Sequence, residues 1–360
     1  MWTGFHALTG FCRNYWDLIL VKIGAAAGMG GLNPVSFSMI TDYFKPNTRP
    51  IAFGVHGTSF IFGVGLAYVF GIALTEDSSN WRQVFFISSI PGAILAIVTF
   101  FTVKEPERGS LDELKDISKP PDTTKLMLYL IKRPSLIILC ISAAIGFLGA
   151  NAIANFTPLF YRRIHDMPPQ EISMFLAWMS PLGGLGGSFF SAIVCMILQK
   201  YTTKGYAIVC LFGAICNAPF QLASLMVEDR YLSLFFFLPA SFFTFTILVP
   251  INLILIQVVP VSGRGFAVGV LGVFVTGIGS LGPLLTGILS SYNFPIFDGV
   301  ENPMAIRWSL VFIHSITRIV IIGDCSLLVF VLPYDIKALE NYYKENTEIE
   351  VIHESEKLIQ

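Results

Sequence analysis

The stretch "VSGRGFAVGVLG" at residues 261–272 places one arginine in front of an apolar run that has a glycine at nearly every helical turn. The stretch "PNTRPIAFGVHG" at residues 46–57 has the same pattern. A shift of 215 residues superposes the pairs Arg49/Arg264, Ala52/Ala267, Gly54/Gly269, Val55/Val270 and Gly57/Gly272. The chain is therefore predicted to consist of two related halves in parallel order.

The repeat continues into the next apolar run, where "WRQVFFISSI" at 81–90 resembles "RWSLVFIHSI" at 307–316. Internal repeats of this kind are typical of secondary transporters, in which a substrate site forms near the middle of the membrane between two halves. We interpret Arg49 and Arg264 as anchors at the starts of equivalent helices, with Asp42 as a contact for Arg49. The glycines that follow would let each helix approach a neighbour closely.

The composition is that of a protein embedded in lipid. Of the 360 residues, 54% are hydrophobic and 13% are charged, whereas soluble domains have about 25% charged residues. The mean hydropathy is +0.68, and the apolar runs reach the roughly 20 residues that a bilayer core requires. We therefore predict an all-α multi-pass membrane protein. The net charge of −1 gives no indication of nucleic-acid binding.

Charged residues, prolines and glycines divide the apolar sequence into ten predicted transmembrane helices. Their approximate ranges are 1–16, 18–42, 51–75, 82–103, 135–160, 171–198, 204–227, 231–258, 265–290 and 307–333. A polar linker at 104–134 separates an incomplete half of four helices at 1–103 from a half of six at 135–333, and a polar tail occupies 334–360. The repeat therefore predicts that the first half is short of two helices.

Lysine and arginine residues are distributed unevenly between the two sides of this predicted bundle. Fifteen of them lie on the side of the linker and six lie on the opposite side. Because positively charged loops stay in the cytoplasm, we predict that the linker and the C-terminal tail are cytoplasmic. Asp42, Arg49 and Arg264 would then form a cytoplasmic gate or anchor region.

The run "KIGAAAGMGGLNPVSFSMITDYFKPNTRPIAFG" resembles the fourth helix and the following loop of the major facilitator superfamily. Lys22 stands at the arginine position of that motif, Met29 stands at its glutamate position, and Pro34, Asp42 and Arg49 match it. The runs "WRQVFFISSIPGAI" followed by "EPERG", and "VVPVSGRGFAVGVLGVFVTGIGSLGPLLTGILSS", resemble the spinster-like lipid transporters within that superfamily.

The resemblance implies a major facilitator fold in which the ten predicted helices are equivalent to helices 3–12 of twelve. It implies secondary active transport by alternating access, with lysophospholipids or sphingoid phosphates as substrates and protons as the coupling ion. In the family, the fourth-helix arginine is paired with an acidic residue on the first helix. Here Lys22 replaces the arginine, and none of the ten predicted helices is equivalent to the first helix that carries the acidic residue. We expect a fragment whose extension would supply about 80 residues with two further spans.

Three candidate binding residues lie on predicted cavity-lining helices. Lys22 lies about one turn inside its helix, where it either contacts the cavity or snorkels to the extracytosolic surface. Asn151 and Asn155 are spaced i, i+4 and therefore share one helix face. They are predicted either to contact substrate or to form hydrogen bonds between helices.

Three further candidates have weaker support. Asn252 and Gln257 are the corresponding polar residues on the tenth helix of the resemblance. Arg318 lies near the middle of the last predicted span, too deep to snorkel easily, and it has either a functional role or a structural partner.

No pattern of catalytic residues favours an enzyme, and no cofactor or metal site is predicted. The six cysteines lack CxxC spacing, and His56 and His314 lack a ligand partner at metal-binding spacing. The leading interpretation is a carrier of lipid-like or small organic substrates in the plasma membrane or an endolysosomal membrane. A carrier of organic anions or sugars, and a non-transporting receptor-like relative, remain as alternatives.

Overall fold

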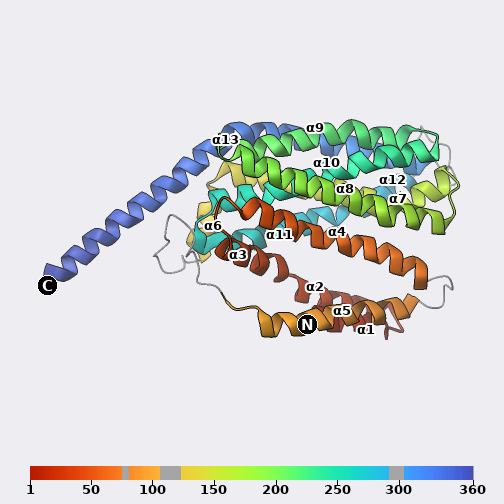
Figure 1. The fold of residues 1–360 in the computed structure, drawn as a ribbon, viewed down its shortest axis with the longest axis horizontal. Coiled ribbons are helices and arrows are strands. Elements are labelled where there is room, and N and C mark those ends of the chain that lie inside the picture. Colours follow the sequence, from red (N-terminus) through yellow and green to blue (C-terminus); the bar gives the residue numbers. More distant parts are fainter. Residues whose placement is uncertain (75–80, 106–122, 292–303, 360) are drawn as a thin grey trace.

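The computed structural model consists of helices and connecting segments in the part of the chain that it describes, residues 1–74, 81–105, 123–291 and 304–359 (Figure 1). The N-terminal half contains α1 (Trp2–Thr9), α2 (Tyr15–Met29), α3 (Leu32–Tyr43), α4 (Arg49–Leu74) and α5 (Trp81–Thr102). After the linker helix α6 (Thr123–Ile131), the C-terminal half contains α7 (Pro134–Ile164), α8 (Pro169–Leu198), α9 (Gly205–Met226), α10 (Arg230–Val258), the short 3-10 turn η1 (Val261–Gly263), α11 (Arg264–Gly279), α12 (Leu281–Ser291) and α13 (Met304–Ile359).

The described residues contain nine helical segments that are long and apolar enough to cross a membrane. The prediction of an all-α multi-pass protein is confirmed, and nine of the ten predicted spans are present. The first predicted span, 1–16, was too long. It forms only the eight-residue helix α1, because Gly10 ends that helix and the polar sequence around Arg13 and Asn14 follows. A helix of this length rises about 12 Å, which is far less than the bilayer core.

Two predicted spans are interrupted near their middle. The span predicted at 18–42 divides into α2 and α3 at Gly30 and Gly31, because two adjacent glycines have low helix propensity. The span predicted at 265–290 divides into α11 and α12 at Ser280, next to Gly279 and before Gly282. Interrupted helices place backbone polar groups at membrane depth, where neighbouring side chains must satisfy them.

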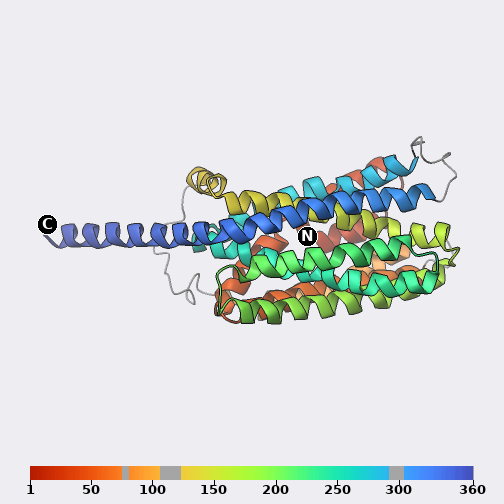
Figure 2. The ribbon, with the colours of Figure 1, turned by 90° about the horizontal axis from the view of Figure 1, so that it is seen from above.

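The two halves lie side by side and meet along α4 and α8, and also where α3 packs against α11 (Figures 1 and 2). One large core cluster crosses this boundary: Phe37 and Phe53 of the N-terminal half are buried with Leu253, Ala267 and other residues of the C-terminal half. We call the end of the bundle that carries α6 and the turns at 44–48 and 259–263 the linker end. The opposite end, with the turn at 165–168, is the far end.

The polar linker and tail contain helices that the sequence analysis did not predict. The linker helix α6 packs against α7, and its Leu126 and Leu130 are buried. The last helix, α13, continues past Pro333 without a break and extends beyond the bundle at the linker end (Figure 2). Within the predicted linker, residues 106–122 lie outside the described residues.

Candidate transport site between the two halves

The contact between α4 and α8 depends on small residues in both helices. A methyl group added to Gly54 would lie 2.9 Å from Cβ of Ala192, and one added to Gly65 would lie 2.6 Å from Cγ of Pro181. From the other side, a methyl group on Gly184 would lie 2.9 Å from Cδ1 of Ile61. Such close approach is how membrane helices gain packing energy without a hydrophobic driving force between them. The prediction of a close glycine contact is confirmed for α4.

The halves are in contact at the linker end. The ring of Phe37 on α3 packs edge-on against Phe53 and His56 of α4, with centroids 5.1 Å and 5.2 Å apart. Gln199 Nε2 donates to the Asn47 carbonyl oxygen across the boundary at 3.3 Å. The hydrogen bond of Gln199 crosses the boundary, and Phe37 and Phe53 belong to the core cluster that both halves share. His56 is half-buried against the Phe37 ring.

Arg49 is a buried capping residue at the linker end. Its Nη2 donates to the Thr41 carbonyl oxygen at 2.7 Å and its Nε donates to the Phe44 carbonyl oxygen at 3.1 Å. These carbonyls belong to the last turn of α3, where helix carbonyls lack an intrahelical partner. Asp42 is buried in the same turn, and Arg264 is buried at the start of α11. The structure therefore places all three predicted gate residues at the linker end.

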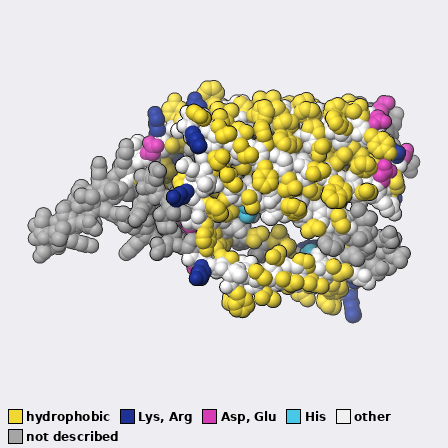
Figure 3. Space-filling view, viewed as in Figure 1, with side chains coloured by type: hydrophobic (Ala, Val, Ile, Leu, Met, Phe, Trp, Pro, Cys, Tyr) yellow, Lys and Arg dark blue, Asp and Glu magenta, His cyan; other side chains and the backbone are white. Residues whose placement is uncertain are grey.

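Three elements of the N-terminal half pack mainly within that half: α2 packs against α1, and α5 packs against α1 and α4. The helix α4 stays in contact with α8 from Gly54 to Gly65. A space-filling view shows the surface hollowed between the two halves (Figure 3). The described structure thus has a buried contact between the halves near the linker end and a hollow between them on the viewed face.

Lys22 lies on α2, in the N-terminal half. Its side chain is exposed, and Nζ lies 4.9 Å from the centroid of the Phe85 ring on α5. The centroid of the His6 ring lies 5.2 Å from that of Phe85, and His6 Nε2 is 3.0 Å from Ser88 Oγ. Within the described residues Lys22 has no carboxylate partner. Its surroundings are therefore aromatic and basic, which suits an anionic group.

Asn151 and Asn155 lie one turn apart on α7, as predicted, but they have different partners. Asn151 Nδ2 donates to the Gly279 carbonyl oxygen at 3.2 Å, at the interruption between α11 and α12. Asn155 is exposed and donates to the Asn151 carbonyl oxygen of its own helix at 2.9 Å. The predicted interhelical hydrogen bond is therefore present for Asn151, and Asn155 keeps an exposed amide.

The other candidates do not share a site with these residues. Asn252 is half-buried and donates to the Leu248 carbonyl oxygen at 3.1 Å within α10. Gln257 is half-buried near the linker end, and its Oε1 has no donor among the described residues. Arg318 is buried inside the C-terminal half, on a helix that packs against α7, α9, α10 and α12.

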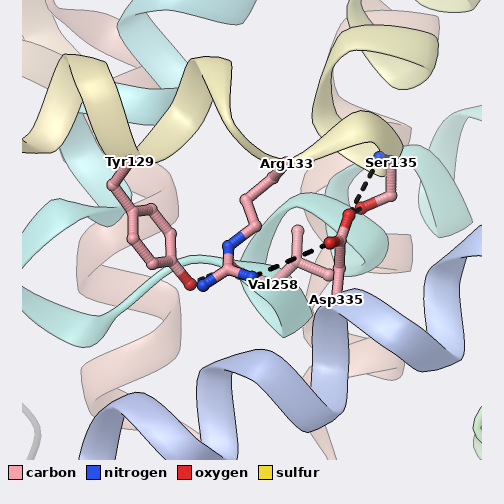
Figure 4. Close-up of polar contacts among 5 residues, drawn as sticks. All are labelled: Tyr129, Arg133, Ser135, Val258 and Asp335. Carbon is pink, nitrogen blue, oxygen red and sulfur yellow. Dashed lines mark hydrogen bonds and ion pairs between the residues drawn. The ribbon is translucent and has the colours of Figure 1, made fainter.

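A polar network that the sequence analysis missed joins the linker helix to the C-terminal half (Figure 4). Asp335 of α13 accepts hydrogen bonds from the Ser135 backbone N–H at 2.9 Å and from its hydroxyl, and it forms an ion pair with Arg133 at 3.9 Å. Tyr129 stacks on the Arg133 guanidinium and donates to the Val258 carbonyl oxygen at 3.2 Å. Burial raises the pKa of the Tyr129 hydroxyl, so it remains a donor.

This network fixes the turn that precedes α11. The Val261 N–H donates to Tyr343 Oη at 3.0 Å, and Leu126 of α6 lies against Gly263. The sequence signal for it was the single carboxylate Asp335 directly after an apolar span, together with an amphipathic nine-residue stretch in the linker. Both features are too common to predict this contact, because the partners lie about 200 residues apart.

Comparison with known proteins assigns this fold to a family. The family model described as "Major Facilitator Superfamily" matches residues 1–283. The chain belongs to this superfamily. The described residues contain nine apolar spans that pack as two halves, and the superfamily and fold predictions are confirmed.

The similar curated major facilitator proteins include spinster homologues. Protein spinster homolog 1 of Xenopus laevis is 24% identical over 249 residues, which are 64% of this chain and 47% of that protein. The sphingosine-1-phosphate transporter SPNS2 of Xenopus tropicalis is 23% identical over 219 residues, which are 58% of this chain and 42% of that protein. The predicted resemblance to spinster-like proteins is confirmed. The chain spans about half the length of these relatives.

Solved structures show the same fold. A bacterial homologue of the human lysosomal transporter Spinster, inward-facing and unoccupied, aligns with a TM-score of 0.64 and 22% identity over 94% of this chain and 82% of that chain. The fucose:proton symporter FucP in its outward conformation also aligns with a TM-score of 0.64, at 13% identity over 91% of this chain and 79% of that chain. At these identities the similarity concerns the fold alone.

Proposed function

We propose that this major facilitator protein takes part in secondary active transport of an amphipathic, anionic lipid-like substrate by alternating access. The observation that carries the proposal is the buried contact between the two halves near the linker end, together with the hollow between them on the face shown in Figure 3. Alternating access requires a boundary that can open at either end, and a boundary closed at one end is one of its two states.

Lys22 is the residue we assign to the anionic group of the substrate. Its exposed ammonium group beside the Phe85 ring offers a positive charge next to an apolar surface. A lysophospholipid or a sphingoid phosphate has this combination of a charged headgroup and an acyl chain. The similarity to SPNS2, a sphingosine-1-phosphate transporter, supports the same class of substrate.

The exposed Asn155 amide is a second candidate contact, on the face of α7 that also carries Asn151. We assign Asn151 to holding the interruption of α11 and α12, and Asn155 to hydrogen bonding with substrate. Asn252 and Gln257 stay candidate contacts on α10. Proton coupling belongs to the same proposal and has its support in the resemblance rather than in an acidic partner of Lys22.

Reconstituted vesicles provide the test. The full chain is inserted into liposomes, and uptake of a fluorescent anionic lysophospholipid is followed with and without a pH difference across the membrane. We expect uptake in wild type, a reduction of at least about tenfold in Lys22→Met because a charge-assisted contact is lost, and no change in Lys200→Met. Lys200 is the matched control because it is an exposed lysine at the linker end.

Other outcomes distinguish the alternatives. Uptake of a sugar or a short organic anion without uptake of the lysolipid would identify the chain as a different carrier of the superfamily. Binding of the lysolipid without uptake would favour a receptor-like relative. Equal uptake by Lys22→Met and wild type would remove Lys22 from the site.

The proposal includes an orientation in which the linker end is cytoplasmic, in the plasma membrane or an endolysosomal membrane. The support is the larger number of lysines and arginines on that side. Cysteines introduced at Asn47 and Lys200, which are exposed at the linker end, are expected to react only with a reagent on the cytoplasmic side. A cysteine at Glu228, exposed at the far end, is the matched control and is expected to react only from the opposite side.

A further inference from the structure

The most unusual side chain in the C-terminal half is Arg318, in the middle of α13. Arg307 lies in the first turn of this helix. Arg318 lies 11 residues further on, or about 16 Å along the helix axis. This distance from the helix end is longer than an arginine side chain. Only 6% of its surface is exposed, and its Nε has no hydrogen-bond acceptor among the described residues. The guanidinium group therefore cannot obtain its solvation from the membrane surface.

No carboxylate on the surrounding helices can neutralise this charge. The helix α13 packs against α7, α9, α10 and α12, and none of these four helices contains an aspartate or glutamate. On α13 itself, Asp324 lies six residues after Arg318, which rotates it about 120° away around the helix. The ion pairs of the described residues involve other side chains.

A second polar side chain lies next to Arg318 on the same helix face. His314 precedes it by four residues and is buried, and its ring forms a hydrogen bond with the Ala218 backbone of α9. The Nε2 atom of this ring is therefore an acceptor, and it has no hydrogen-bond partner in the described part of the chain. Buried polar groups are almost always satisfied, and an isolated buried charge is strongly unfavourable. The buried Arg318 guanidinium therefore requires a negative charge, and an acceptor for its Nε–H, that the side chains around it do not supply.

We propose that a small monovalent inorganic anion, of the chloride class, binds inside the C-terminal half at Arg318. The Arg318 guanidinium would supply the positive charge, and its Nε–H would supply a hydrogen-bond donor. A small anion matches this site because the guanidinium has a positive charge and only hydrogen-bond donors, whereas the anion has one negative charge and only accepts hydrogen bonds.

This site is separate from the proposed transport site. Arg318 lies on α13, which carries none of the residues assigned to the substrate and whose packing partners all belong to the C-terminal half. The anion would remain bound there and neutralise the charge of Arg318. The inference therefore stands whether or not the protein transports a lipid.

The test measures thermal unfolding of the full chain in detergent at constant ionic strength, with chloride progressively replacing gluconate, which is too large for such a site. Wild type is expected to gain stability with chloride. At a chloride concentration ten times the dissociation constant, the folding equilibrium constant rises about elevenfold.

Arg318→Met removes the charge but keeps an unbranched side chain, and it is expected to unfold at the same temperature in both anions. In gluconate it is expected to be at least as stable as wild type, because an uncompensated buried charge has been removed. Lys337→Met, which removes an exposed lysine of the same helix, is the matched control and is expected to keep the full chloride response.

Two results would overturn the proposal. One is a chloride response in Arg318→Met equal to that of wild type, which would place the anion elsewhere. The other is no chloride response in wild type.

Discussion

The helices α4 and α11 have related sequences but different surroundings. Each begins with a buried arginine and carries glycines at equivalent positions. In α4 these glycines face α8, and Gly54 could not accept even a methyl group without moving Ala192. In α11, a methyl group added to Gly269 or Gly272 would have no atom of the described residues within 4 Å, and the neighbouring Val273 is 74% exposed.

The turns before the two helices are also held differently. Arg49 secures the first turn from within, by donating to the carbonyls of Thr41 and Phe44. The second turn is held from outside, by Tyr129 of the linker helix and Tyr343 of α13. A shared sequence pattern thus produces a helix that is able to make a close contact, whereas the neighbouring elements determine which contact it makes.

The largest effect is expected from overpacking the glycine contact of α4. Gly54→Leu should lower the free energy of unfolding by about 3 kcal/mol, because the added side chain must displace Ala192 or separate α4 from α8. The matched control is Gly272→Leu, about one helical turn after Gly269, which is the repeat equivalent of Gly54. It should change the free energy of unfolding by less than about 0.5 kcal/mol. Thermal unfolding of the purified chain measures both. Equal losses of unfolding free energy in the two variants would mean that the open glycine face of α11 is covered by another helix in the membrane.

A smaller loss is expected from the arginine that holds the turn before α4. Arg49→Met should cost about 2 kcal/mol, because two carbonyls at the end of α3 lose charge-assisted hydrogen bonds. Arg49→Lys should restore part of the loss, since lysine keeps the charge but not the forked geometry. Chemical denaturation followed by tryptophan fluorescence measures the difference. A lysine variant as unstable as the methionine variant would show that the planar guanidinium, and not its charge, is required.

The turn before α11 should respond to the linker helix instead. Tyr129→Phe and Tyr343→Phe each remove one hydrogen bond and should each cost about 1 kcal/mol. Hydrogen exchange of residues 259–264 should become faster in both variants, and exchange of residues 44–48 should not change. Tyr334→Phe, at an exposed tyrosine of α13, is the control. Unchanged exchange at 259–264 would contradict the view that Tyr129 and Tyr343 hold this turn.

The smallest effect is expected at the interruption of α11, which α4 does not have. Asn151→Leu should cost about 0.6 kcal/mol, the average for a hydrogen bond between membrane helices, because the Gly279 carbonyl loses its donor. Asn155→Leu should cost less, since its amide bonds only within its own helix. Unfolding temperatures of the two variants give the comparison. A larger loss for Asn155 would reverse the assigned roles.

The apolar runs, the repeat and the glycine pattern could be read from the sequence, because helix length and periodicity are local properties of the chain. They predicted nine of the spans, the division into two halves, the positions of Arg49 and Arg264 at the starts of equivalent helices, and the shared face of Asn151 and Asn155. They also provided the family resemblance, since its motifs are contiguous.

Which polar groups meet depends instead on how distant segments pack. Asp335 contacts Ser135 across 200 residues of sequence, Asn151 finds the Gly279 carbonyl on another helix, and Lys22 lies beside an aromatic ring rather than a carboxylate. The burial of Arg318 among helices without acidic residues is likewise a property of packing. The physical reason is that helix formation satisfies the backbone within each segment, whereas side-chain charge and hydrogen bonding are satisfied by whichever distant segment packs alongside.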